Sequence, residues 1–183
     1  MITCILSGGV GNQLFQIFTT IVVAREHNTE FGFSNMDVLA PGFASERPTY
    51  WKSCFAFLRP YLFELDDPRV KDMTGIPESK ISRKMALDVD KSYALIGGFQ
   101  NVRYFSEHRK GLMNYFNIPM LKANITSVEF FPPIIWSDTI SMHFRFGDYK
   151  KFTHIYSILT FEYYYNAMQH IVLDSMGHNI NIN

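Results

Sequence analysis

The chain of 183 residues has few cysteines, no excess charge and no long apolar run. Cys4 and Cys54 are too few for a disulfide framework and show no metal-ligand spacing. Seventeen basic and 17 acidic residues give a formal net charge of zero, which argues against a partner held by bulk charge. We therefore expect no metal ion, no nucleic acid and no strongly anionic membrane as a partner.

The N-terminus lacks the features of a secretory signal. Residues 1–6 are apolar, but no basic segment precedes them, and Gly8 and Gly9 interrupt the run. No segment has the length of a transmembrane helix, so a cytoplasmic location, or one at the periphery of a membrane, is expected. The share of hydrophobic residues, 47%, is typical of a folded domain. The length suits one large domain, or one domain and part of a second.

The chain opens with a predicted strand, a glycine loop and a predicted helix. Residues 1–6 form a short apolar strand pattern, and apolar residues recur at helical spacing over 12–27. Between them, the stretch SGGVGNQLFQ (7–16) holds three glycines and then two adjacent amides. This order is typical of the first unit of a βαβ fold, so an α/β protein is expected.

The glycine loop is a candidate ligand site. Gly9 and Gly11 would let a ligand approach the backbone, and Asn12 and Gln13 offer donors and acceptors beside the free N–H groups of a helix N-terminus. The loop is not a Walker P-loop, and the third glycine of the dinucleotide fingerprint falls on Leu14. The alternative is a tight structural turn with a capping amide; we interpret the glycines and amides as substrate-binding.

The middle of the chain is less regular. Residues 30–34 and 93–96 are predicted strands, while 41–92 show scattered prolines and little order. The second strand ends in Gly97-Gly98-Phe99-Gln100, which is typical of a turn before a helix, here expected over 102–112. Gln100 is a further candidate for substrate binding.

A domain boundary is predicted at Pro132-Pro133. It separates residues 1–133, an N-terminal domain, from 134–183, the start of a second. Within the latter, a helix is predicted over 161–174, and the last residues alternate in polarity as a strand does when it begins.

The stretch SDTISMHFRFGDY (137–149) predicts a strand, because polar and apolar residues alternate along it. His143 and Arg145 then share one face near the carboxyl end, where ligands bind in open α/β sheets. The planar fork of Arg145 suits a phosphate group. A structural ion pair between Arg145 and Asp148 is the alternative.

Three stretches together resemble the α-1,2-fucosyltransferases, glycosyltransferase family 11. They are GGVGNQLFQ near the N-terminus, GGFQNVRYF in the middle, and HFRFGDY before the YYYNAM segment. They follow the family's order and approximate spacing, and the resemblance extends from about Met1 to Asp174. In the region 41–92 it is poor.

The resemblance implies a GT-B architecture of two Rossmann-like halves. The N-terminal half, 1–133, would meet a galactose-containing acceptor, and the second half would hold GDP-fucose. Fucose would pass to a galactoside 2-hydroxyl with inversion and without a metal ion or other cofactor. The resemblance also implies that Arg145 binds the donor pyrophosphate, that Arg145 and Asp148 are catalytic residues, and that His143 contacts the substrate. The alternative role of Asp148 is to orient Arg145.

Two departures from the family separate this chain from a typical member. Phe146 stands where the family usually has a second arginine. Family members also continue for roughly another hundred residues, enough to complete a second domain, so the chain is expected to be truncated at the C-terminus. Two alternatives follow: an inactive remnant that binds glycans, and a module whose open sheet edge pairs with a protein partner.

Overall fold

The computed structural model describes residues 1–39, 46–82, 85–117, 123 and 139–177. The chain divides into two compact units, Met1–Ile125 and Thr126–Asn183, which are described separately below. The predicted boundary at Pro132-Pro133 and the predicted terminal strand lie outside the described residues.

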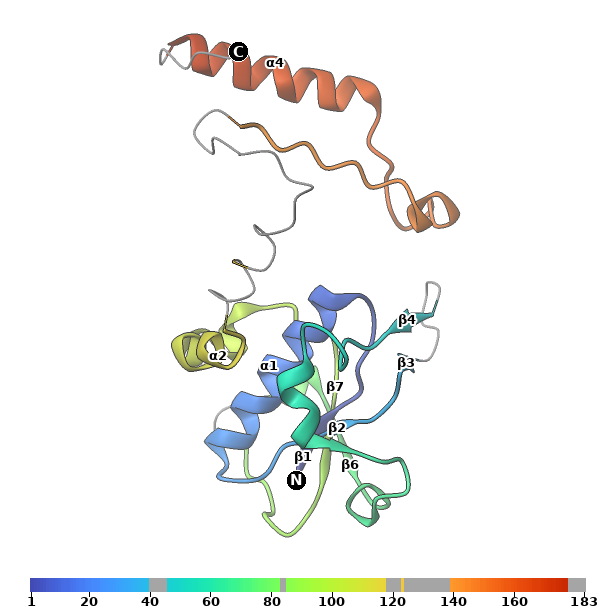
Figure 1. The fold of residues 1–183 in the computed structure, drawn as a ribbon, viewed down its shortest axis with the longest axis vertical. Helices are drawn as coiled ribbons and strands as arrows, with labels where there is room; N and C mark the ends of the chain where they lie inside the picture. The colour runs from blue at the N-terminus through green and yellow to red at the C-terminus, as the bar shows by residue number, and fades with distance from the viewer. Residues whose placement is uncertain (40–45, 83–84, 118–122, 124–138, 178–183) are drawn as a thin grey trace. The chain divides into compact units, whose positions relative to one another are not determined.

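A three-stranded parallel sheet forms the centre of the first unit (Figure 1). Its order is β1 (Ile2–Cys4), β7 (Tyr93–Ile96) and β6 (Thr74–Pro77), with Leu95 opposite both Cys4 and Ile76. The strands predicted at 1–6 and 93–96 are confirmed, as is the α/β class. Because all three strands run the same way, their carboxyl ends meet at one edge.

Helix α1 (Val10–Glu26) follows the glycine loop and packs against β1. It buries Ile17, Ile21 and Val22, which recur at the spacing of one helical face. The predicted helix is confirmed, but it begins two residues earlier than expected, because Val10 and Gly11 already adopt helical geometry.

The region predicted to hold little order contains a strand of the central sheet, β6, and several shorter elements. These are β4 (Arg47–Pro48), β5 (Leu62–Phe63) and the 3₁₀ helices η1 (Ala56–Tyr61), η2 (Pro68–Val70) and η3 (Glu78–Lys80). Two strands from before this region pair with them: β3 (Val38–Leu39) runs antiparallel to β4, and β2 (Phe33–Ser34), the last part of the strand predicted over 30–34, runs parallel to β5. The sequence of β6, TGIP, is poor in strand-forming residues, and only Ile76 in it is buried. Its pairing with β7, and not its own composition, makes it a strand.

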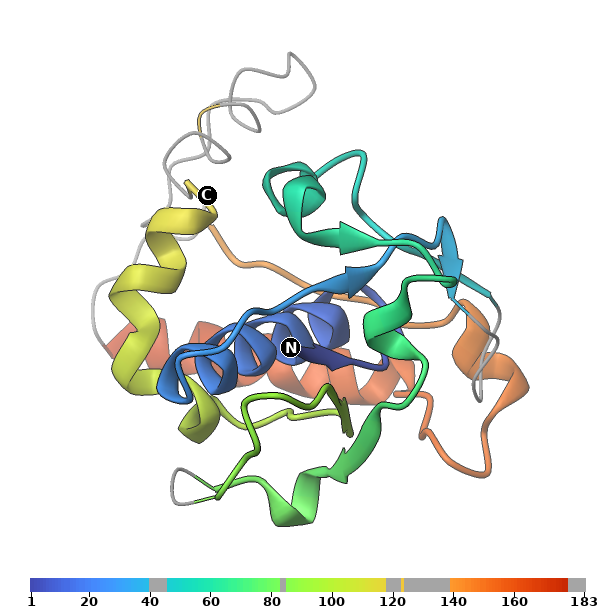
Figure 2. The same ribbon diagram turned by 90° about the horizontal axis from the view of Figure 1, so that it is seen from below.

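The helix predicted over 102–112 is only partly correct. Two 3₁₀ turns, η4 (Val102–Tyr104) and η5 (Ser106–His108), precede the short helix α2 (Arg109–Tyr115). Asn101 caps the first turn by accepting from the Arg103 N–H, and the φ of −143° at Phe105 departs from helical geometry. Figure 2 shows α2 beside α1, where Phe116 packs edge-on against Phe18.

The second unit contains the 3₁₀ helix η7 (Asp148–Lys151) and helix α4 (Phe161–Gly177). Helix α4 confirms the predicted helix and extends it by three residues. The predicted strand is wrong: residues 139–146 carry no strand assignment in the described part of this unit. Alternating polarity marks which side chains share a face, but a strand also needs a neighbour for its backbone hydrogen bonds. None of the described helices combines the length and apolar character that crossing a bilayer requires.

The two cysteines should differ sharply in reactivity. Cys4 lies in the core, and burial raises the pKa of its thiol to about 12, whereas the half-buried Cys54 has its pKa raised less by the same cause. We expect iodoacetamide at pH 8 to label Cys54 in the native protein and Cys4 only in urea, because the thiolate is the nucleophile. Equal native labelling of both thiols, measured by mass spectrometry beside Cys54→Ser, would contradict the burial of Cys4.

Candidate functional site

The candidate site of the first unit lies at the carboxyl edge of the central sheet. The glycine loop follows β1, the turn Gly97–Gln100 follows β7, and Glu78 directly follows β6. Ligands of open α/β sheets bind beyond this kind of edge. The two loops that the sequence singled out are therefore neighbours.

Gly8 is the glycine that the loop conformation requires. Its φ is +72°, and a Cβ at this position would overlap the side-chain amide of Asn12. Gly9, the N-cap of α1, has ordinary extended geometry, and a Cβ on Gly9 or Gly11 would meet open space. The sequence pattern predicted substrate contacts at Gly9 and Gly11 but gave no role to Gly8. The open space at Gly9 and Gly11 leaves room for a ligand beside the helix N-terminus, and their contact with substrate stays a prediction.

Two predicted substrate-binding amides, Asn12 and Gln100, contact each other. Gln100 Nε2 donates to Asn12 Oδ1 at 2.9 Å across 88 residues of sequence. Asn12 is half-buried and Gln100 is exposed. Among the described residues, no other partner engages Asn12 Nδ2 or Gln100 Oε1. This leaves a donor and an acceptor side by side at the surface, and a sugar hydroxyl can bind both because it accepts and donates.

Gln13 lies beneath the loop instead of on its surface. Its side chain is fully buried, and Nε2 donates to the carbonyls of Gly8 and Pro48, each at 3.0 Å. These bonds tie the loop to β4. Its Oε1 has no partner among the described residues, and direct contact with substrate stays a prediction for this residue.

Gln16 and Glu78 are two further polar residues of this edge, and neither was predicted from the sequence. Gln16 is fully buried; Oε1 accepts from the Ser7 N–H at 2.9 Å, and Nε2 donates to Ser7 Oγ at 2.9 Å and to the Gly97 carbonyl at 3.0 Å. The sequence contains a signal for Gln16, because Gln13 and Gln16 are three residues apart and so share one face of an otherwise apolar helix. Glu78 carried no such signal, since it lies in the segment predicted to have little order.

The residues predicted to bind the donor belong to the second unit. Arg145 stacks over the Tyr149 ring at 4.6 Å, and the His143 carbonyl accepts from the Tyr164 hydroxyl at 3.3 Å. His143 also lines a cavity of about 240 Å³ together with residues of α4. The side chain of Asp148 lies outside what the structure describes. The roles of Arg145, His143 and Asp148 remain predictions.

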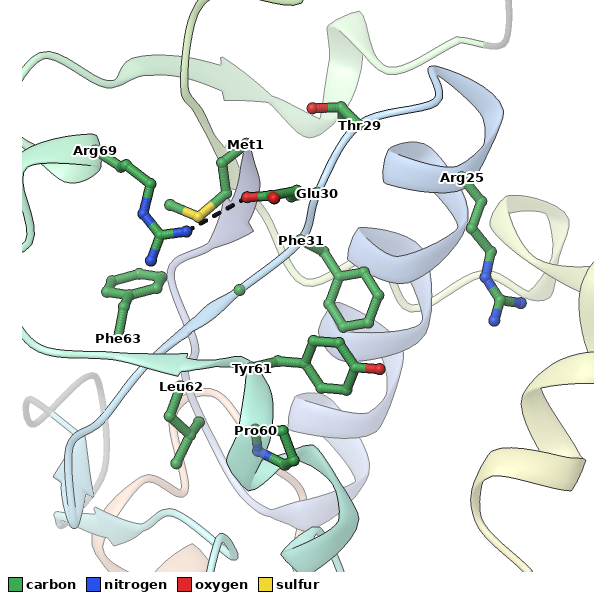
Figure 3. Close-up of a pocket in the computed structure, with 11 residues that line it drawn as sticks. Met1, Arg25, Thr29, Glu30, Phe31, Pro60, Tyr61, Leu62, Phe63 and Arg69 are labelled. Carbon is green, nitrogen blue, oxygen red and sulfur yellow. Dashed lines mark hydrogen bonds and ion pairs between the residues drawn. The ribbon is translucent and has the colours of Figure 1, made fainter.

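A larger cavity of about 350 Å³ lies at the opposite, amino-terminal edge of the sheet (Figure 3). Its charged groups already have partners within the protein, since Arg69 contacts Glu30 at 3.4 Å and Asp67, outside the lining, at 2.6 Å, and Arg25 stacks on the Tyr115 ring at 4.9 Å. Phe31 and Tyr61 stack in its wall at 4.4 Å. We give the carboxyl edge more weight, because hydrogen-bonding groups remain open to a ligand there. No group of three or more potential metal ligands gathers anywhere among the described residues.

A search of curated proteins found a relative named alpha-1,2-colitosyltransferase, from Escherichia coli. The two proteins are 24% identical over 184 residues, which is 91% of this chain and 62% of the relative. This chain therefore spans about three fifths of the relative's length. No protein-family model and no solved structure matches the chain.

Proposed function

We propose that this chain belongs to a glycosyltransferase that moves L-fucose from GDP-fucose to the 2-hydroxyl of a galactoside with inversion. The amide pair of Asn12 and Gln100 carries the proposal. These two residues were predicted from separate motifs to bind substrate. A hydrogen bond of 2.9 Å joins their side chains at the edge of the sheet where ligands of α/β proteins bind. The relative, whose name gives an α-1,2 transferase, supports transfer to a 2-hydroxyl and extends over nearly the whole chain.

In this proposal the two halves of a GT-B enzyme divide the work. Residues 1–133 form the acceptor half, where the amide pair binds a galactoside hydroxyl. Residues 134–183 begin the donor half, where Arg145 binds the pyrophosphate. As the acceptor oxygen bonds to the fucosyl C1, the bond from C1 to the GDP oxygen breaks and negative charge grows on GDP. A guanidinium already in position stabilises that charge more in the transition state than in the ground state.

A second candidate function is glycan binding without transfer. It is favoured by the position of the amide pair, which lies entirely within the first unit and involves no donor-side residue. Pairing of an open sheet edge with a protein partner is a third alternative. A galactoside that binds while GDP-fucose does not would favour glycan binding alone.

The proposal is tested by titrating the full chain with methyl β-D-galactopyranoside and, separately, with GDP-fucose. We expect Asn12→Ala to weaken galactoside binding about tenfold, the value of one hydrogen bond of about 1.4 kcal/mol. We expect Arg145→Ala to weaken GDP-fucose binding at least tenfold, since hydrogen bonds to charged groups contribute about 1.5–3 kcal/mol.

Matched controls separate these effects from general damage. Asn114→Ala changes an exposed asparagine on α2, and Arg25→Ala removes an arginine that stacks on Tyr115 at 4.9 Å, much as Arg145 stacks on Tyr149. Both controls should bind as the parent chain does. Absence of galactoside binding by the parent chain would sink the proposed acceptor site, and absence of GDP-fucose binding would sink transfer by this chain alone.

A further inference from the structure

Phe99 adopts a backbone conformation that bulky residues rarely take. Its φ is +50°, and its side chain is fully buried. A non-glycine residue in this region is strained and persists only where its surroundings hold it. Phe99 directly precedes Gln100, so whatever holds Phe99 also sets the direction of the Gln100 side chain.

Glu78 holds Phe99 with one carboxylate oxygen. Its Oε2 accepts from the Phe99 N–H at 3.0 Å, and its Oε1 accepts from the Tyr104 hydroxyl at 3.0 Å. The Tyr104 ring in turn packs edge-on against Phe99 at 5.5 Å. A carboxylate suits this place because it only accepts hydrogen bonds, and both of its neighbours here are donors. Arg103 donates to the Tyr104 hydroxyl at 2.8 Å and so places a cation at the end of the chain of bonds.

The position of Glu78 is fixed by the sheet. Glu78 follows Pro77, which pairs with Ile96 at the end of β7. Residue 97 must be a glycine to leave room for Glu78, because a Cβ at this position would lie 2.6 Å from Glu78 Cβ. The turn is thus held at Gly97 by Gln16 and at Phe99 by Glu78.

We infer that Glu78 is a positioning residue that holds the Gly97–Gln100 turn so that Gln100 stays bonded to Asn12. This inference rests on the proposed function, in which the amide pair receives the galactoside. Glu78 does not touch the sugar in this arrangement. It acts through the backbone of Phe99, and its removal releases the strained residue and with it the Gln100 amide.

The test compares Glu78→Ala with Glu78→Gln in the full chain by two readouts. Side-chain amide signals of Asn12 and Gln100 in ¹H–¹⁵N spectra report the pair directly, and titration with methyl β-D-galactopyranoside reports its use. In Glu78→Ala we expect both signals to shift toward free-amide positions and affinity to fall about tenfold, in line with one lost hydrogen bond. Glu78→Gln should keep the parent chain's amide signals and galactoside affinity, because its Oε1 can accept from the Phe99 N–H while its Nε2 donates to the Tyr104 hydroxyl.

Glu64→Ala is the matched control. Glu64 Oε1 accepts from Asn35 at 2.6 Å, so this variant also removes a carboxylate that holds a side-chain amide, at a residue outside the turn. Unchanged Asn12 and Gln100 signals in Glu78→Ala would overturn the inference, as would the same loss of affinity in Glu64→Ala. If Glu78→Ala does not fold, Glu78→Met keeps most of the side chain's bulk but removes both hydrogen bonds, and unchanged amide signals in that variant would also overturn the inference. A parent chain that binds no galactoside refutes the proposed acceptor site, while the amide signals still decide the role of Glu78.

Discussion

Replacing Leu95 by alanine should lower the free energy of unfolding by about 3–5 kcal/mol, the range measured for buried leucines. Leu95 lies in the central strand of the sheet, opposite Cys4 on one side and Ile76 on the other, and it is 0% exposed. Truncation removes its buried methyl groups and leaves a cavity that three paired strands cannot close without shifting their register.

Leu65→Ala is the control for this prediction. Leu65 is 67% exposed, so the same chemical change there should cost within about 0.5 kcal/mol. Urea denaturation followed by circular dichroism gives both values, with the midpoint shifted and the slope unchanged. Equal effects of the two substitutions would mean that Leu95 is not at the centre of the core.

Gln16→Met should lower the free energy of unfolding by about 3 kcal/mol. Methionine keeps the length of the side chain but removes three hydrogen bonds, to the Ser7 N–H, to Ser7 Oγ and to the Gly97 carbonyl. Each bond contributes about 1 kcal/mol, and polar groups left without partners add a desolvation cost where water cannot reach them. The effect is large because this one amide joins the loops that follow β1 and β7.

Gln100→Met is the control for Gln16→Met. Gln100 is exposed, so water can replace its bond to Asn12 and the change in stability should stay within about 0.5 kcal/mol. The two variants are compared in the same urea titration. A Gln16→Met protein as stable as Gln100→Met would show that the buried amide does not hold the loops together.

Local pattern was sufficient for the elements whose own residues define them. The period of α1 and the apolar runs of β1 and β7 are visible in the sequence, and all three elements were predicted. The predictions for β6 and for residues 139–146 were wrong for opposite reasons. The first has a poor strand sequence but a partner, β7; the second has a strand sequence but no strand partner among the described residues of its unit.

The residues of the candidate site were likewise predicted only where the signal was local. The sequence identified the glycine loop, Asn12 and Gln100, because glycines and amides between a strand and a helix are a local signal. It could not separate the half-buried Asn12 from the fully buried Gln13 next to it, since the direction of each side chain depends on what packs against α1. It also missed Gly8, whose positive φ and close approach to the Asn12 side chain are properties of the folded loop.

By itself the sequence determined the α/β class, the helix that follows the glycine loop, and two loops with hydrogen-bonding chemistry. Only the tertiary structure decided that Asn12 meets Gln100, that Gln16 joins the two loops, and that Glu78 supports a strained Phe99. The physical reason is the range of the interactions. Propensity and periodicity act over a few residues, whereas parallel strand pairing brings residues 21 to 88 positions apart to one edge of a sheet.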